Sequence, residues 1–126
     1  MSKRTFVIFG TLAICLAVLI PLWAFGAKGE EESSSSGEQL FATNCGNCHT
    51  LAAAGTEGNF APDLDVLLAP QGPAPTAEAA KGVEERVLAA IDAGFDSDTP
   101  GRMPAGILDG EQAKTVAAFV GREAGK

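Results

Sequence analysis

The pentapeptide Cys45-Gly46-Asn47-Cys48-His49 constrains this chain more tightly than any other stretch. Two cysteines three positions apart, followed directly by a histidine, form the attachment signature of a c-type haem. The two thiols can form thioethers with the two vinyl groups of a porphyrin, and His49 stands where an iron ligand is needed. The motif therefore predicts one covalently bound haem c, held by Cys45, Cys48 and His49.

Cysteines at this spacing also occur in redox dithiols and in zinc sites. A dithiol enzyme is expected in a βαβ context, and this chain has little strand signal. A structural zinc site usually needs four Cys or His ligands, whereas the remaining cysteine, Cys15, lies in a long apolar run and His49 is the only histidine. Haem attachment is the favoured interpretation, with the dithiol and the zinc site as its alternatives.

Met103 is the candidate for the second axial ligand of the iron. It is the only methionine besides Met1, and one histidine cannot provide bis-histidine coordination within one chain. Pro104 favours an extended backbone at Met103, and the flanking Gly101 and Gly106 permit tight turns. A methionine can also fill a gap in a small core, which is the alternative role. Downstream of a haem motif, the sequence favours a role as ligand.

The N-terminal quarter of the chain differs in composition from the rest. Residues 1–5 contain basic residues and are expected to stay in the cytoplasm. Residues 6–25 are mostly apolar and, at about 1.5 Å per residue, would span about 30 Å as a helix, which predicts a transmembrane anchor. A cleaved signal peptide is the alternative, because Ala24-Phe25-Gly26 offers a small-x-small cleavage pattern. In either case the haem motif would lie outside the cytoplasm.

The remaining chain divides into a linker and one small domain. Residues 26–36 are rich in Gly, Ser and Glu and are expected to form a flexible, charged linker. Residues 37–126 are interpreted as a single all-α domain, with about three to five helices around the haem. Apolar spacing and capping residues predict helices from near Glu38 into the haem motif, over residues 77–93 ahead of Gly94, and from the N-cap Asp109, with Gln112 as its capping-box partner.

Two loops are expected between these helices. Residues 59–76 contain several prolines, which oppose regular structure, and residues 95–108 carry Met103. Apolar residues at helical spacing predict the core-facing sides of the two later helices. These residues are Val83, Val87 and Ile91 in the first, and Val116, Phe119 and Val120 in the second.

The domain resembles the class I monohaem cytochromes c of the small bacterial type. The resemblance covers the whole domain and rests on several stretches in the family's order, although Ala61 stands where the family usually has glycine. The matching residues are Gly37 and Phe41 in the first helix, the haem motif, Ala61-Pro62-Asp63-Leu64, Met103-Pro104-Ala105, and Phe119 in the last helix.

The resemblance implies contacts for several of these residues. The carbonyl of Pro62 would accept a hydrogen bond from His49, and Phe119 would pack against the first helix. The family often binds a haem propionate through Trp or Tyr, but the chain has no Tyr and its one Trp lies in the apolar run. Arg102 or Asn59 is therefore expected to contact a propionate, unless the propionates meet water.

With both axial positions filled, the resemblance implies an electron carrier and not an enzyme. We expect it to pass electrons from a quinol-oxidising complex to a terminal oxidase or similar acceptor, on the periplasmic side of a bacterial cell membrane. A fixed haem c subunit of a larger oxidase or reductase is the alternative, and weak binding of Met103 would permit peroxidase or gas-binding chemistry. The net charge of −7 predicts a neutral or basic docking face on the partner proteins. The same charge argues against nucleic acid as a partner. No small-molecule substrate is expected.

Overall fold

A computed structural model describes residues 36–96 and 102–126. These residues belong to a compact unit that runs from Ser33 to Lys126. The expected anchor over residues 6–25 and nearly all of the expected linker lie outside the described residues. Within the described ranges, none of the helices has the length and apolar character needed to cross a membrane.

The described elements are mostly helical, as the sequence predicts. The first is a helix over residues 36–44, and the prediction of a helix leading into the haem motif is confirmed. The others, in chain order, are β1 (Thr50–Leu51), the 3-10 helix η1 (Ala52–Ala54), β2 (Thr56–Glu57), α2 (Leu64–Leu68), α3 (Ala77–Ala93) and α4 (Gly110–Glu123). The two short strands pair antiparallel, with Thr50 opposite Glu57 and Leu51 opposite Thr56.

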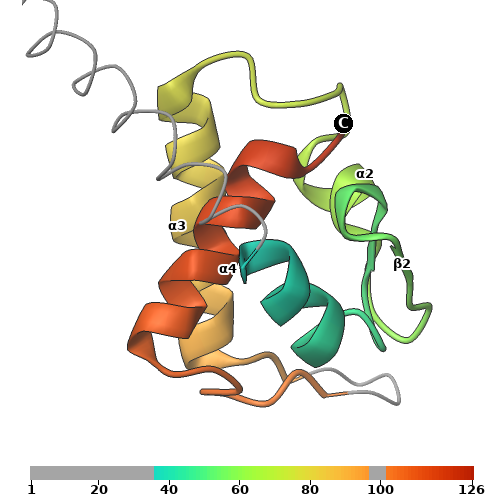
Figure 1. The fold of residues 1–126 in the computed structure, drawn as a ribbon, viewed down its shortest axis with the longest axis vertical. Coiled ribbons are helices and arrows are strands. Elements are labelled where there is room, and N and C mark those ends of the chain that lie inside the picture. The colour runs from blue at the N-terminus through green and yellow to red at the C-terminus, as the bar shows by residue number, and fades with distance from the viewer. Residues whose placement is uncertain (1–35, 97–101) are drawn as a thin grey trace, which may run out of the picture. The chain divides into compact units, whose positions relative to one another are not determined.

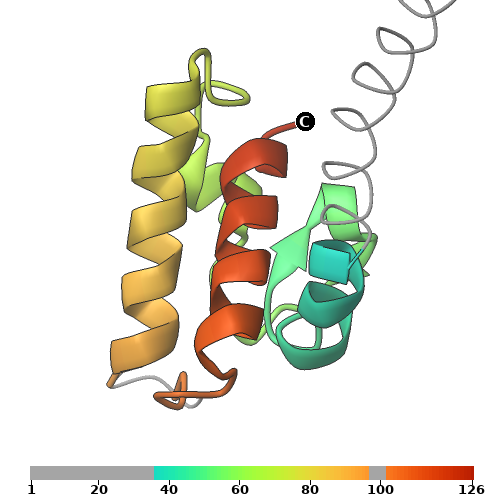
Figure 2. The same cartoon turned by 60° about the vertical axis from the view of Figure 1, so that its left-hand side comes forward.

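The helix α4 lies at the centre of this unit. It packs along α3 on one side and against the helix over residues 36–44 on the other (Figures 1 and 2). The pair β1–β2 and α2 lie on the side away from α3 (Figure 1). The described parts of the chain between these two helices, residues 94–96 and 102–109, run below the ends of both helices in the same view.

Helix α3 begins and ends where the sequence predicts, and α4 begins where the sequence predicts. The hydroxyl of Thr76 accepts a hydrogen bond from the Ala79 N–H at 3.2 Å and caps the start of α3, and Gly94 follows its last residue. The carboxylate of Asp109 accepts a hydrogen bond from the Gln112 N–H at 3.1 Å and caps the start of α4. Each cap satisfies a backbone N–H that has no partner within its own helix.

The helix α2 lies within residues 59–76, where the sequence predicts only irregular structure. Pro62 and Pro70 stand on either side of it, so no proline interrupts its hydrogen bonds. The carboxylate of Asp63 caps its start by accepting a hydrogen bond from the Asp65 N–H at 2.9 Å. The prolines therefore delimit a short helix, and the prediction of a wholly irregular segment is wrong.

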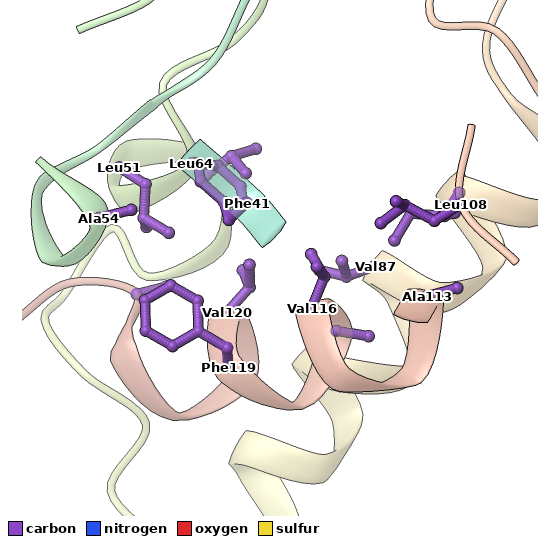
Figure 3. Close-up of a cluster of buried hydrophobic side chains, with 13 residues drawn as sticks. Phe41, Leu51, Ala54, Leu64, Val87, Leu108, Ala113, Val116, Phe119 and Val120 are labelled. Carbon is purple, nitrogen blue, oxygen red and sulfur yellow. The ribbon is translucent and has the colours of Figure 1, made fainter. Parts of the chain in front are cut away.

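The hydrophobic core forms where α4 meets its two neighbours. Phe41 from the first helix and Val120 from α4 point toward one another (Figure 3). The largest side chains that are at most 2% exposed are Phe41, Leu51, Ile91, Val116, Phe119 and Val120. The predicted core-facing side of α4 is thus confirmed, and so is that of α3, where Ile91 and Val87 are buried and Val83 is partly buried against the same core.

Gly37 permits a close crossing between the first helix and α4. A Cβ atom on Gly37 would lie 2.5 Å from the Cβ of Phe119 and 3.0 Å from the carbonyl oxygen of Thr115. A larger residue would overlap these atoms and push the two helices apart. The predicted packing of Phe119 against the first helix is thus confirmed.

Candidate functional site

The haem motif continues directly from the helix over residues 36–44. The backbone N–H groups of Cys45 and Gly46 both donate to the carbonyl of Phe41, at 2.8 and 3.0 Å. Those of Cys48 and His49 donate to the carbonyl of Cys45, at 3.0 and 2.9 Å. The motif is therefore a hydrogen-bonded turn that carries both thiols and the imidazole on one short segment.

One ring nitrogen of His49 is held by the backbone. Its Nδ1 lies 2.8 Å from the carbonyl oxygen of Pro62, which is the contact that the family resemblance predicts. A carbonyl oxygen can only accept, so Nδ1 carries the proton and Nε2 keeps the lone pair that a metal ion requires. A ligating histidine is commonly oriented by a backbone carbonyl in this manner.

The chain that follows the motif folds back over it. The Thr56 hydroxyl donates to the His49 carbonyl at 3.0 Å and accepts from the Leu51 N–H at 3.0 Å. At Gly58 the backbone passes so close that a Cβ atom would lie 2.5 Å from the carbonyl carbon of Cys48 and 2.7 Å from the His49 nitrogen. Residue 58 must therefore be glycine for the backbone of the motif to be enclosed in this way.

The two cysteines differ in exposure. Cys48 is exposed, whereas Cys45 is half-buried and packs against the core. Burial, together with the nearby Cys48, raises the pKa of the Cys45 thiol from 9.0 to about 11. Before haem attachment, Cys45 is thus a neutral thiol at physiological pH.

Met103 lies in the chain segment that connects α3 to α4, and its side chain is partly buried against the core. Its carbonyl accepts a hydrogen bond from the Phe95 N–H at 3.0 Å, in an isolated antiparallel bridge. Three residues further on, the Gly106 N–H donates to the carbonyl of Ile91 in α3 at 2.8 Å. The backbone around Met103 is thereby joined to the end of α3.

Arg102 forms an ion pair with Asp96, and both side chains are largely exposed. Such surface pairs contribute only about 0–1 kcal/mol, so the guanidinium is free to exchange this partner for another anion. Asn59 is exposed as well. Contact of Arg102 or Asn59 with a haem propionate stays a prediction.

The residues of the haem motif and those around Met103 are of the kinds that a haem requires. The haem motif supplies two thiols and a free imidazole nitrogen, and the neighbouring chain leaves large apolar side chains in contact with water. Phe60 is 72% exposed and precedes Pro62 closely in the chain, while Phe95 at 62% and Ile107 at 38% flank Met103. A porphyrin ring needs an apolar surround, and exposed side chains of this size can contribute to one.

Residues 34–122 match the family model of cytochrome c. The chain belongs to the cytochrome c family. It is 32% identical over 118 residues to cytochrome c6 of Picosynechococcus sp., across 90% of this chain and 92% of that relative. The crystal structure of the c-type cytochrome SorU from Sinorhizobium meliloti is similar at a TM-score of 0.54 and 32% identity, and the match covers 76% of this chain and 95% of that one.

Membership of this family confirms the predicted cofactor. The cytochrome binds one covalently attached haem c, for which Cys45 and Cys48 have the required spacing. It is an electron-transfer protein that acts with redox partner proteins. The dithiol and zinc interpretations of the two cysteines are therefore set aside.

One residue near the site escaped the sequence analysis. The carboxylate of Asp65 accepts hydrogen bonds from the Ala52 N–H at 2.8 Å and from the Gly125 N–H at 2.7 Å. These bonds join α2 both to η1, just after the haem motif, and to Gly125, which lies two residues beyond the end of α4. No local sequence signal marks this role, because Gly125 is 60 positions away in the chain.

Proposed function

We propose that this cytochrome carries single electrons on a haem c that His49 and Met103 would hold through the iron and that Cys45 and Cys48 would hold through thioether bonds. When bound, the haem supplies a one-electron iron couple. The proposal is carried by the hydrogen bond between His49 Nδ1 and the carbonyl of Pro62, because it leaves Nε2 free for the metal.

The two ligands would leave no axial position open for oxygen or a substrate, which supports an electron carrier and not an enzyme. Met103 as a ligand favours a higher reduction potential than a second histidine would. The carbonyl of Pro62 would hold the imidazole of His49 in one tautomer and one orientation. The partial burial of Met103 would limit the number of side-chain conformations open to its thioether.

We propose a quinol-oxidising complex as the electron donor and a terminal oxidase or similar complex as the acceptor, on the periplasmic face of a bacterial membrane. The support comes from the apolar residues 6–25, which would tether the domain, and from residues 26–36, which would let it move between complexes. The same anchor would also suit a fixed subunit of one complex. Purification of the full chain in mild detergent separates these two cases, because only a fixed subunit brings a stoichiometric partner with it.

The surface charge supports partners with a basic docking face. Most basic side chains of the described residues form an ion pair with a carboxylate three or six positions away in the chain. Among the side chains without such a pair, acidic groups therefore outnumber basic ones. The paired cations are Lys81, Arg102, Lys114 and Lys126. With a basic docking face on the partner, the rate of association between the two proteins should fall as the salt concentration rises.

The ligand assignment is tested by optical titration of the full chain, produced with a c-type maturation system. The oxidised wild type should show low-spin haem with the methionine–iron charge-transfer band, and the reduced wild type should not bind carbon monoxide. Met103→Ala should lose the band and bind carbon monoxide, whereas Arg102→Ala, beside it in the chain, should do neither. A wild type that is high-spin, or that binds carbon monoxide readily, would contradict the proposal and favour a sensor or catalytic role.

A further inference from the structure

The segment that carries Met103 is bonded to Ile91 in α3 and to Phe95, which lies two residues beyond the end of that helix. The Phe95 N–H donates to the carbonyl of Met103 itself, and the Gly106 N–H donates to the carbonyl of Ile91. Both are backbone contacts, at 3.0 and 2.8 Å, and neither involves the haem. The place of Met103 relative to α3 is therefore determined by the polypeptide.

Gly94, which directly follows α3, lies against this segment and leaves no space for a side chain. A Cβ atom on Gly94 would lie 2.6 Å from the Ala105 nitrogen and 2.7 Å from the carbonyl oxygen of Met103. These are backbone atoms, which cannot rotate away as the end of a flexible side chain can. The φ of 66° and ψ of −176° at Gly94 also lie in a region that is almost confined to glycine.

We infer that Gly94 is a positioning residue for the axial methionine, and that the end of α3 holds the backbone of Met103 ready to bind the iron. This inference rests on the proposed function, in which Met103 is a ligand. With a Cβ atom at position 94, the distance between that atom and the Met103 carbonyl oxygen would have to increase from 2.7 Å to an ordinary contact distance of 3.4 Å or more. A displacement of that size matters for a ligand bond, since misplacement by about 1 Å can cost a reactive geometry about a hundredfold.

The test compares Gly94→Ala with Gly106→Ala in the holoprotein. Gly106 is a matched control because alanine there keeps the backbone N–H that donates to Ile91, and because the φ of 64° is strained for alanine while a Cβ atom would have no neighbour within 4 Å. Both variants acquire a strained backbone, and only Gly94→Ala also acquires the overlap with the backbone of Met103 and Ala105. The readouts are the methionine–iron band per haem and the rate of carbon monoxide binding, measured where circular dichroism shows each variant to be folded.

We expect Gly106→Ala to keep the wild-type band and Gly94→Ala to lose most of it. Carbon monoxide should bind reduced Gly94→Ala faster than reduced Gly106→Ala by about tenfold or more. Equal bands and equal rates in the two variants would overturn the inference. A wild type without the band would overturn the proposed ligation and this inference together.

Hydrogen exchange provides a second test that does not depend on whether Gly94→Ala folds. In the Met103→Ala holoprotein the iron–sulfur bond is absent, but the contacts with α3 remain. The Phe95 and Gly106 amides should therefore stay as protected from exchange as in the wild type. Loss of their protection would mean that the iron holds the segment in place, which contradicts positioning by α3.

Discussion

Replacement of Asp65 by asparagine should destabilise the cytochrome, because the Asp65 carboxylate joins three separate parts of the domain. Its Oδ2 accepts from the Ala52 N–H at 2.8 Å and its Oδ1 from the Gly125 N–H at 2.7 Å. An asparagine side chain has one acceptor oxygen, so its NH₂ group would face one of these N–H groups as donor against donor. One bond is lost and the other loses its charged acceptor.

The size of the effect follows from these two bonds. A hydrogen bond to a charged group contributes about 1.5–3 kcal/mol, and the lower part of this range applies because Asp65 is only partly buried and water can reach the released N–H. With the weakened second bond, we expect a loss of about 2 kcal/mol in the free energy of unfolding. For a domain of this size, that corresponds to a fall in Tm of about 8–16 °C.

The assay is guanidinium chloride unfolding of the holoprotein, followed by far-ultraviolet circular dichroism. Asp92→Asn is the matched control, because it removes the same charge from an exposed position that makes no side-chain hydrogen bond within the described part of the chain. Its free energy of unfolding should stay within about 0.5 kcal/mol of the wild type. Equal unfolding midpoints for the two variants would refute the reasoning about Asp65.

Two further predictions concern the core and the haem motif. Phe119→Ala should lower the free energy of unfolding by about 3–5 kcal/mol, since Phe119 is 2% exposed and its removal leaves a cavity between two helices; a loss under about 1 kcal/mol in the same assay would contradict this. The second prediction concerns Cys45 in the haem-free chain, where burial raises the thiol pKa from 9.0 in the unfolded chain to about 11 in the folded chain. Below pH 9.0 the thiol is neutral in both states and the folded chain has its full stability. As the pH rises from 9.0 towards about 11 that stability falls, because the thiol of the unfolded chain ionises first. The measurement is the pH dependence of the rate at which iodoacetamide alkylates Cys45. Its midpoint should lie near pH 11 in the folded chain and near pH 9.0 in guanidinium chloride. The same midpoint under both conditions would contradict burial of the thiol.

Features that depend on local chemistry could be predicted from the sequence. The haem motif needs only five adjacent residues. The start of α4 at the Asp109 cap and the end of α3 before Gly94 each depend on neighbours within one helical turn. The contact between His49 and Pro62 spans 13 positions, and it was expected only because the family resemblance implies it.

Features that depend on distant partners could not be predicted in this way. The prolines around α2 suggested an irregular segment, because their effect on a helix depends on whether they lie inside it or at its ends. Gly94 could be interpreted as the end of a helix, but its contact with Met103 exists only because the chain returns to that point. The anchor over residues 6–25, the redox partners and the membrane location stay predictions.

The bond between Asp65 and Gly125 has a consequence for the order of events during synthesis. A chain leaving the ribosome presents the haem motif long before α4, which packs against Phe41, and 60 positions separate Asp65 from its partner at Gly125. The bond that joins α2 to the end of the chain therefore cannot form until the chain has been made as far as residue 125. During that interval the thiol of Cys45, which is half-buried in the folded domain, is still accessible for haem attachment.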